Sequence, residues 1–121
     1  MIQSRERGVR PALYIMPRLT FVHPDASRTT IQVASGITAM EAARRHQIRG
    51  IKAECGGQCW CSTCHCYLDH AWLERLPPKN DNEASLIEFA WEPRETSRLT
   101  CQIMLTDALD GLVLYVPERQ L

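Results

Sequence analysis

The sequence lacks any hydrophobic run long enough to cross a membrane, and it lacks any bias in charge or composition. Its longest apolar runs, Ala12–Met16 and Leu112–Val116, are far shorter than the roughly 18 residues that a spanning helix needs. The formal charge is zero, and 45% of the residues are hydrophobic, so nothing indicates disorder or low-complexity repeats. We therefore expect one globular domain without a membrane segment.

Motifs for catalysis and nucleotide binding are also missing. The sequence has no phosphate-binding loop and no flavin fingerprint, and its Asp and His residues are scattered without a recognisable nucleophile. We therefore name no catalytic residue and expect a protein that is not an enzyme.

The N-terminal segment differs in charge from the rest of the chain. Residues 1–18 carry four arginines against one glutamate and lack the apolar core of a secretory signal. We predict a flexible extension over residues 1–16, a single domain over residues 17–121, and a bacterial cytoplasmic location. The remaining residues hold ten cations against thirteen carboxylates, and eight of those carboxylates lie between Glu54 and Glu95. This acidic stretch favours basic protein partners over nucleic acid.

Six cysteines without an export signal argue for metal binding, because a reducing cytosol disfavours disulfide frameworks. Five of them lie between Cys55 and Cys66, where disulfides would close strained loops of a few residues. Cys55, Cys61 and Cys64 form a C-x5-C-x2-C pattern, and Cys101 follows after thirty-six intervening residues. Four thiolates are the ligand set of a 2Fe-2S cluster. We predict that these four cysteines hold one such cluster.

Other metal sites fit the cysteine spacing less well. The plant-type C-x4-C-x2-C pattern fails from either possible start, because it requires cysteine at Tyr67 or at Asp69. A zinc site of four cysteines, or of three cysteines and one histidine, stays open as the alternative, using Cys61, Cys64 and Cys101 and perhaps His65 or His70. Cys59 and Cys66 are left over, and we predict that both are free thiols near the cluster.

The patterning predicts an α+β domain. Residues 19–22 and 29–33 are predicted to form a hairpin around a Pro24-Asp25 turn. Thr38 and Glu41 form a capping box for a helix over residues 39–47 that stops at Gly50. The Gly- and Cys-rich residues 53–65 are predicted to form an irregular loop, and residues 99–104 and 112–116 are predicted to be strands.

A second helix is predicted from Asp81 to a stop at Pro93. Its inward face is expected to carry hydrophobic residues, and its solvent face is expected to carry carboxylates. The inward set is Leu86, Phe89 and Ala90, and the outward set is Glu83, Glu88 and Glu92.

With these features in place, the sequence resembles the adrenodoxin and putidaredoxin type of 2Fe-2S ferredoxin over about 105 residues, from Pro17 to Leu121. The shared motifs are Glu54-Cys55-Gly56-Gly57, Ser62-Thr63-Cys64-His65, Ser97-Arg98-Leu99-Thr100-Cys101-Gln102, Leu109-Asp110-Gly111-Leu112-Val113 and Val116-Pro117-Glu118-Arg119-Gln120. The resemblance implies a β-grasp (ubiquitin-like) fold with one 2Fe-2S cluster. It also implies a monomer that shuttles electrons from an FAD-containing NAD(P)H ferredoxin reductase to a haem-thiolate monooxygenase of the cytochrome P-450 class.

The resemblance also implies a docking surface on the acidic helix after the cluster loop. This surface maps onto Asp81, Glu83 and Glu88, and Glu54 in the loop adds a further carboxylate. Ser85 stands where an acidic residue is common, and Trp60 occupies a position that is usually small. Trp60 is therefore a candidate to shield the cluster, to contact a partner or simply to fill space.

Two other functions remain open. The Cys64-His65-Cys66 triplet favours a ferredoxin for iron-sulfur cluster assembly, whereas Gly56-Gly57 and Asp110-Gly111 favour a monooxygenase donor. The other class of alternative is a zinc-stabilised interaction module without redox activity.

Overall fold

The structure of the chain, a computed structural model, describes residues 16–51 and 64–120. A five-stranded sheet forms its centre, in the order β2-β1-β5-β3-β4. Within the two described ranges, no helix is long and apolar enough to cross a membrane. The strands are β1 (Arg18–Val22), β2 (Arg28–Gln32), β3 (His65–Tyr67), β4 (Ser97–Leu99) and β5 (Leu112–Tyr115).

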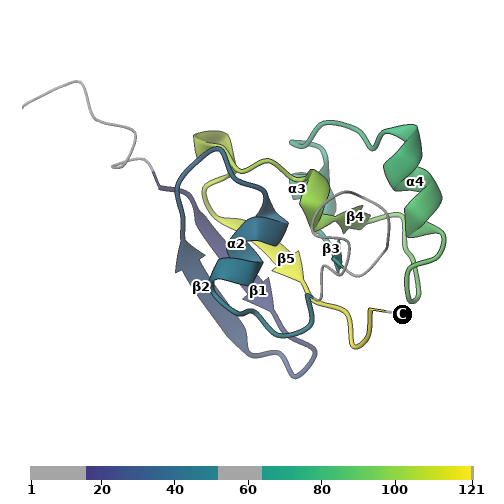
Figure 1. Cartoon of the computed structure of the whole chain (residues 1–121), viewed down its shortest axis with the longest axis horizontal. Coiled ribbons are helices and arrows are strands. Elements are labelled where there is room, and N and C mark those ends of the chain that lie inside the picture. The colour runs from purple at the N-terminus through teal and green to yellow at the C-terminus, as the bar shows by residue number, and fades with distance from the viewer. Residues whose placement is uncertain (1–15, 52–63, 121) are drawn as a thin grey trace, which may run out of the picture.

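The sheet is mixed, because β1 pairs with β5 in parallel and the other neighbouring strands pair antiparallel. Figure 1 shows the helix α2 (Ala39–Arg45) lying across one face of this sheet. The short helix α4 (Asp81–Ile87) lies against β4, whereas α3 (His70–Leu73) lies where Trp72 approaches Gly111, just before β5. The 3-10 turns η2 (Thr100–Gln102) and η3 (Asp107–Leu109) follow β4. This arrangement is the predicted α+β, β-grasp fold.

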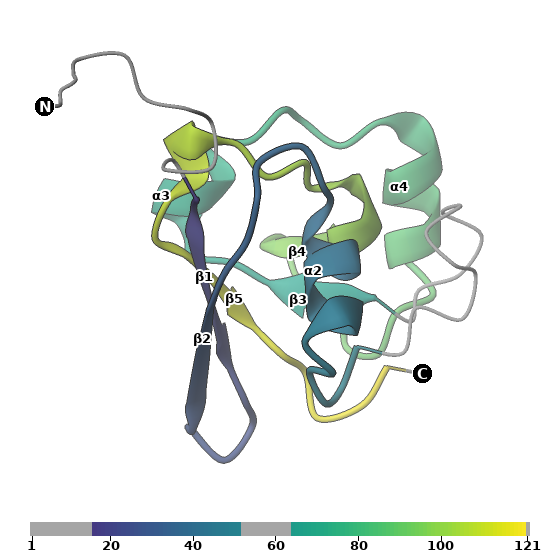
Figure 2. The same ribbon diagram turned by 60° about the vertical axis from the view of Figure 1, so that its left-hand side comes forward.

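The predicted hairpin is confirmed. Leu19 and Phe21 point into the core from β1, and Ile31 does so from β2, as the alternation of a half-buried strand requires. In the turn, the Asp25 carboxylate accepts hydrogen bonds from the Ser27 amide at 3.0 Å and the Ser27 hydroxyl at 2.6 Å. Figure 2 shows the hairpin extending away from the rest of the fold.

The predicted start of α2 is also confirmed, since the Thr38 hydroxyl accepts a hydrogen bond from the Glu41 amide at 3.1 Å. The end differs from the prediction: α2 stops at Arg45, and Gln47 takes the left-handed conformation with φ of 56°. The Ile48 amide then donates to the Ala43 carbonyl at 2.9 Å, which closes a Schellman turn. Gly50 is therefore not the stop, although its φ of +90° and its closeness to Val116 do demand glycine.

The region from residue 81 to residue 104 corrects several predictions. Helix α4 ends at Ile87, well before Pro93, so the chain beyond it leaves the helical phase. Phe89 was predicted to face inward and is 74% exposed, whereas Glu83 was predicted to face solvent and is 1% exposed. Of the predicted strand 99–104 only Leu99 belongs to a strand, as the last residue of β4, and η2 follows it. Strand β3 was not predicted, and it begins at His65, the last residue of the predicted loop.

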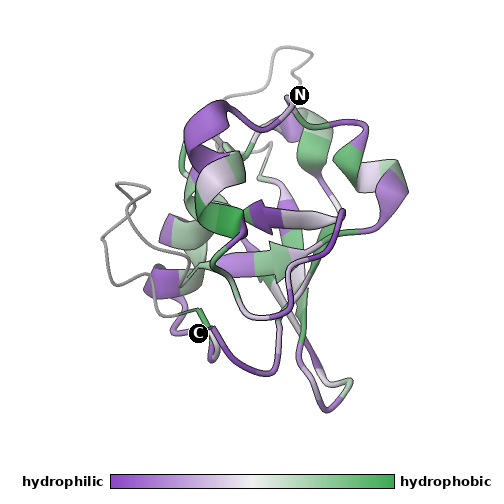
Figure 3. Cartoon of the chain, turned by 90° about the vertical axis from the view of Figure 1, so that its right-hand side faces the viewer, coloured by the Kyte–Doolittle hydropathy of each residue, from purple (hydrophilic) through white to green (hydrophobic). Residues whose placement is uncertain are grey.

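One hydrophobic core runs from the hairpin through α2 to the cysteines. Figure 3 shows hydrophobic stretches beside hydrophilic ones on the helices, as amphipathic helices require. Cys64, Cys66 and Cys101 are all members of this core, with exposed fractions of 5% or less. The cysteine-bearing turns are therefore continuous with the packed interior.

Candidate metal centre

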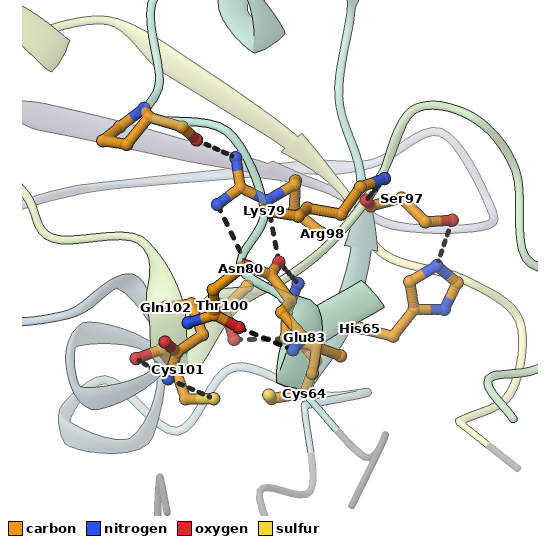
Figure 4. A network of polar contacts seen from close by, with 12 residues as sticks. Cys64, His65, Lys79, Asn80, Glu83, Ser97, Arg98, Thr100, Cys101 and Gln102 are labelled. Carbon is orange, nitrogen blue, oxygen red and sulfur yellow. Dashed lines mark hydrogen bonds and ion pairs between the residues drawn. The ribbon is translucent and has the colours of Figure 1, made fainter. Parts of the chain in front are cut away.

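Two of the four predicted ligands, Cys64 and Cys101, come together at one end of the β3-β4 pair. Cys64 immediately precedes β3, and Cys101 lies in η2, which begins directly after β4. The register that pairs His65 with Leu99 therefore places the two cysteines side by side. Figure 4 shows their sulfur atoms facing each other.

The electrostatics of this pair suit a bound cation. The pKa of the Cys64 thiol is raised, first by its hydrogen bond with Cys101 and then by burial. Two adjacent buried thiols resist deprotonation because each would place a negative charge beside the other in a poorly solvated site. Iron offsets that cost by supplying positive charge directly to the sulfurs, so the donor set fits an iron-sulfur cluster.

The other two predicted ligands and the rest of the predicted cluster loop lie outside the described residues. They are Cys55, Cys61, Glu54, Cys59, Trp60, Gly56 and Gly57. Within residues 16–51 and 64–120, no group of three or more His, Cys, Asp or Glu side chains is arranged to hold a metal. Of the four predicted ligands, the described residues therefore contain two.

Cys66 differs from Cys64 in its surroundings. It lies in the middle of β3, fully buried, and the pKa of its thiol is raised by burial alone. No second thiol contributes to that shift, in contrast to Cys64. Cys66 is a free, buried thiol, and its position near the cluster but outside the ligand set stays a prediction.

Neither histidine of the zinc alternative is arranged as an evident ligand. Nε2 of the buried His65 ring lies 2.7 Å from the Ser97 hydroxyl oxygen. Burial, and after it the positive charge of Arg94, lowers the pKa of His65 to about 4. His65 is therefore neutral at physiological pH, and its Nδ1 has no hydrogen-bond partner within the part of the chain that is described. His70 is exposed and lies 3.7 Å from Glu95.

Glu83 has a structural position that sequence reasoning missed. Its carboxylate forms a two-pronged ion pair with Arg98, at 2.7 Å to Nε and 3.1 Å to Nη2, and both side chains are almost fully buried. The same carboxylate accepts a hydrogen bond from the Leu99 amide at 2.9 Å. Glu83 therefore attaches α4 to β4 and is not available to a partner, which corrects its predicted docking role. Figure 4 shows this network beside Cys64 and Cys101.

Gln120 is a second residue that the local sequence did not single out. Its side-chain oxygen accepts a hydrogen bond from the His65 amide at 3.0 Å, and its side-chain nitrogen donates to the His65 carbonyl at 3.1 Å. The same nitrogen also donates to the Gly50 carbonyl. Gln120 thus connects the chain before the cysteine-rich segment to the chain after it.

This fold and this pair of buried cysteines fit a small iron-sulfur protein. Comparison with known proteins identifies its family. The family described as 2Fe-2S iron-sulfur cluster binding domain matches residues 22–106. Rhodocoxin of Rhodococcus erythropolis is 42% identical over 106 residues, and putidaredoxin of Pseudomonas putida is 39% identical over 106 residues. Each alignment covers 87% of this chain and 99% of the relative. The chain belongs to the 2Fe-2S ferredoxins of the putidaredoxin type.

Solved structures agree with this assignment. A ferredoxin from Rhodopseudomonas palustris HaA2 is 48% identical with a TM-score of 0.83, covering 87% of this chain and all of that one. Putidaredoxin in its covalent complex with putidaredoxin reductase is 38% identical with a TM-score of 0.80, covering 84% of this chain and 99% of that one. An ISC-like 2Fe-2S ferredoxin from Pseudomonas putida JCM 20004 is 29% identical with a TM-score of 0.72, covering 88% and 96%.

Family membership settles the cofactor and the kind of protein. The chain carries one 2Fe-2S cluster, and it is an electron carrier rather than an enzyme. The zinc alternative is therefore set aside. The cluster supplies reversible uptake and release of one electron, and the polypeptide supplies thiolate ligands, burial and a surface for partners.

The buried ion pair gives the first prediction. Glu83→Gln keeps the shape of the side chain and leaves the Arg98 charge buried without compensation, which costs about 3–5 kcal/mol in the free energy of unfolding. Chemical denaturation of matched preparations measures this loss. Glu88→Gln, an exposed change on the C-cap of the same helix, is the control and should stay within about 0.5 kcal/mol of the unchanged protein. Equal stability of the two variants would contradict the role given to Glu83.

Proposed function

We propose that this ferredoxin carries single electrons from an FAD-containing NAD(P)H ferredoxin reductase to a haem-thiolate monooxygenase of the cytochrome P-450 class. We further propose that it acts as a monomer in a bacterial cytoplasm, with its cluster held by Cys55, Cys61, Cys64 and Cys101. The observation that carries the proposal is the buried Cys64–Cys101 pair in a chain of the putidaredoxin type. The relative that was solved in a complex with its reductase supports the choice of the first partner.

The ligand assignment is tested by serine substitutions. Cys55→Ser, Cys61→Ser, Cys64→Ser and Cys101→Ser should each abolish or strongly alter the visible absorption of the cluster, because each removes one thiolate from iron. Cys59→Ser and Cys66→Ser are the matched controls, since they change the same atom in cysteines left outside the ligand set. Bleaching by either control, with retention in any of the four, would show that the assignment is wrong.

The surface of α4 is suited to transient docking. Asp81 and Glu88 are exposed at its two ends, and the exposed Glu92 follows a few residues later. Because Glu83 attaches this helix to β4, a partner bound there lies against the segment that leads into Cys101. Carboxylates at such a surface increase the rate of encounter with a basic partner more than they increase the final affinity.

Salt provides the test of this docking surface. The double variant Asp81→Asn, Glu88→Gln should be reduced by a ferredoxin reductase roughly fivefold more slowly than the unchanged protein at low ionic strength. The difference should disappear at high ionic strength, where exposed charges are screened. Glu74→Gln, an exposed charge change at the end of α3, is the control. A reduction rate that is independent of salt in the unchanged protein would overturn acidic docking.

Phe89 adds an apolar element to the same surface. Its ring is 74% exposed directly after Glu88, and an exposed aromatic residue inside a charged rim has the composition of an interface hot spot. We expect Phe89→Ala to weaken reductase binding roughly tenfold, with little change between low and high salt, because apolar burial is not screened. Met104→Ala is the control, because Met104 is the other large hydrophobic residue that is exposed within the described ranges. Binding unchanged by Phe89→Ala would remove Phe89 from the interface.

The second candidate function is the supply of electrons for iron-sulfur cluster assembly. One observation favours it, namely the similarity in fold to the ISC-like ferredoxin. The higher identity to putidaredoxin and rhodocoxin favours the monooxygenase role. Reconstitution with each class of acceptor, driven by the same reductase, distinguishes the two functions by the faster oxidation of the reduced chain.

A further inference from the structure

The carbonyl oxygen of Cys64 is held by two hydrogen bonds from a single residue. The Thr100 amide donates to it at 3.0 Å, and the Thr100 hydroxyl donates to it at 2.8 Å. Thr100 and Cys64 are both 0% exposed, so neither bond competes with water. Thr100 immediately precedes Cys101 in the chain. Its two hydrogen bonds therefore connect the peptide of Cys64 to the residue before Cys101. Figure 4 shows this contact.

The two bonds have different origins. The amide bond continues the antiparallel β3-β4 ladder by one step beyond the His65–Leu99 pair. The hydroxyl bond is an addition that sheet geometry does not require, because a valine at this position would leave the backbone bond in place. A buried hydroxyl contributes one donor, and Thr100 directs that donor to the Cys64 carbonyl.

The same peptide group is also fixed from its other side. The His65 amide, which belongs to the Cys64–His65 peptide, donates to the Gln120 side chain at 3.0 Å. Three hydrogen bonds therefore restrain one peptide plane, two on its oxygen and one on its nitrogen. A rotation of this plane would break buried bonds, and buried polar groups without partners are costly.

We propose that the Thr100 hydroxyl is a positioning group for the cluster, which fixes the Cys64 peptide relative to Cys101 and thereby keeps the two sulfurs in their mutual arrangement. The inference rests on the proposed ligation by Cys64 and Cys101. Thr100 is not an iron ligand in this role, although its hydroxyl also lies within hydrogen-bond reach of the Cys64 thiol. It acts through the Cys64 carbonyl, and its loss leaves that oxygen with one donor in place of two.

The consequence concerns retention of the cluster and the geometry around iron. Release of iron requires the thiolates to detach from it, and the hydroxyl bond opposes movement of the Cys64 peptide away from the Cys101 turn. Loss of the bond also permits a different tilt of the Cys64 peptide, and the spectrum of a reduced iron-sulfur cluster depends on the orientation of its ligands. Both effects depend on the hydroxyl group and not on side-chain volume.

The experiment compares Thr100→Val, which removes the hydroxyl at nearly constant volume, with Thr100→Ser, which keeps it. We expect the cluster of the valine variant to bleach in the presence of an iron chelator about fivefold faster than that of the unchanged protein, the factor that corresponds to about 1 kcal/mol. We also expect altered g-values in electron paramagnetic resonance of the dithionite-reduced valine variant. The serine variant should restore both quantities.

Thr29→Val is the matched control. Its hydroxyl lies 3.0 Å from Nε2 of His23, on β2 at the opposite end of the sheet from β4. Thr29→Val therefore removes one threonine hydroxyl and its part-buried hydrogen bond to a side chain, away from the site. Its bleaching rate and g-values should equal those of the unchanged protein. Bleaching of Thr100→Val at the rate of Thr29→Val, with unchanged g-values, would overturn the proposal, and so would equal effects of valine and serine at position 100.

A second pair of variants covers the case in which Thr100→Val assembles no cluster. Thr100→Ser and Thr100→Ala are both smaller than threonine, and only serine retains the hydroxyl. Slower bleaching in the serine variant than in the alanine variant supports the proposal, and equal rates overturn it. A failure of the ligand assignment is recognised separately, because Cys64→Ser or Cys101→Ser would then keep the absorption of the unchanged cluster.

Discussion

The buried ion pair between Glu83 and Arg98 is the constraint on which the acidic side of the molecule depends. Removing two charges from water is costly, and the pair is tolerable because its hydrogen bonds are satisfied: Glu83 also accepts from Leu99, and Arg98 also donates to Pro77. Helix α4 has only seven residues and would not be stable alone. The ion pair holds α4 against β4, which places the proposed docking surface next to the strand that leads into the Cys101 turn.

The cysteine pair belongs to the hydrophobic core, which links cofactor binding to folding. Cys64 and Cys101 sit in turns at the ends of β3 and β4, and α2 packs against the η2 turn that carries Cys101. The pKa of the Cys64 thiol is raised by its buried place beside Cys101, so a bound metal cation would favour its deprotonation. The β-grasp sheet thus positions the two proposed ligands through strand register, whereas the proposed docking residues lie outside the sheet.

Local signals were enough to predict the hairpin, the start of α2 and strand β5. These signals are the alternation at Leu19 and Phe21, the capping box at Thr38 and the apolar run Leu112–Val116. Glu83 could not be predicted, because pattern reasoning assigns a lone carboxylate to solvent and the compensating Arg98 lies fifteen residues away. Phe89 was misplaced because the helix ends at Ile87 and the periodicity no longer applies. For the site, spacing selected the cysteines, while the bonds from Thr100 and Gln120 depend on tertiary contacts that spacing does not encode.

The position of Gln120 in the chain has a consequence for the order of events during synthesis. Gln120 bonds to residues that come 70 and 55 positions earlier, on either side of the cysteine-rich segment. The ribosome therefore delivers all six cysteines before it delivers the side chain that bridges the flanks of their segment. A nascent chain can offer its thiols to iron early, but the hydrogen bonds from Gln120 to Gly50 and His65 form only once translation has passed residue 120.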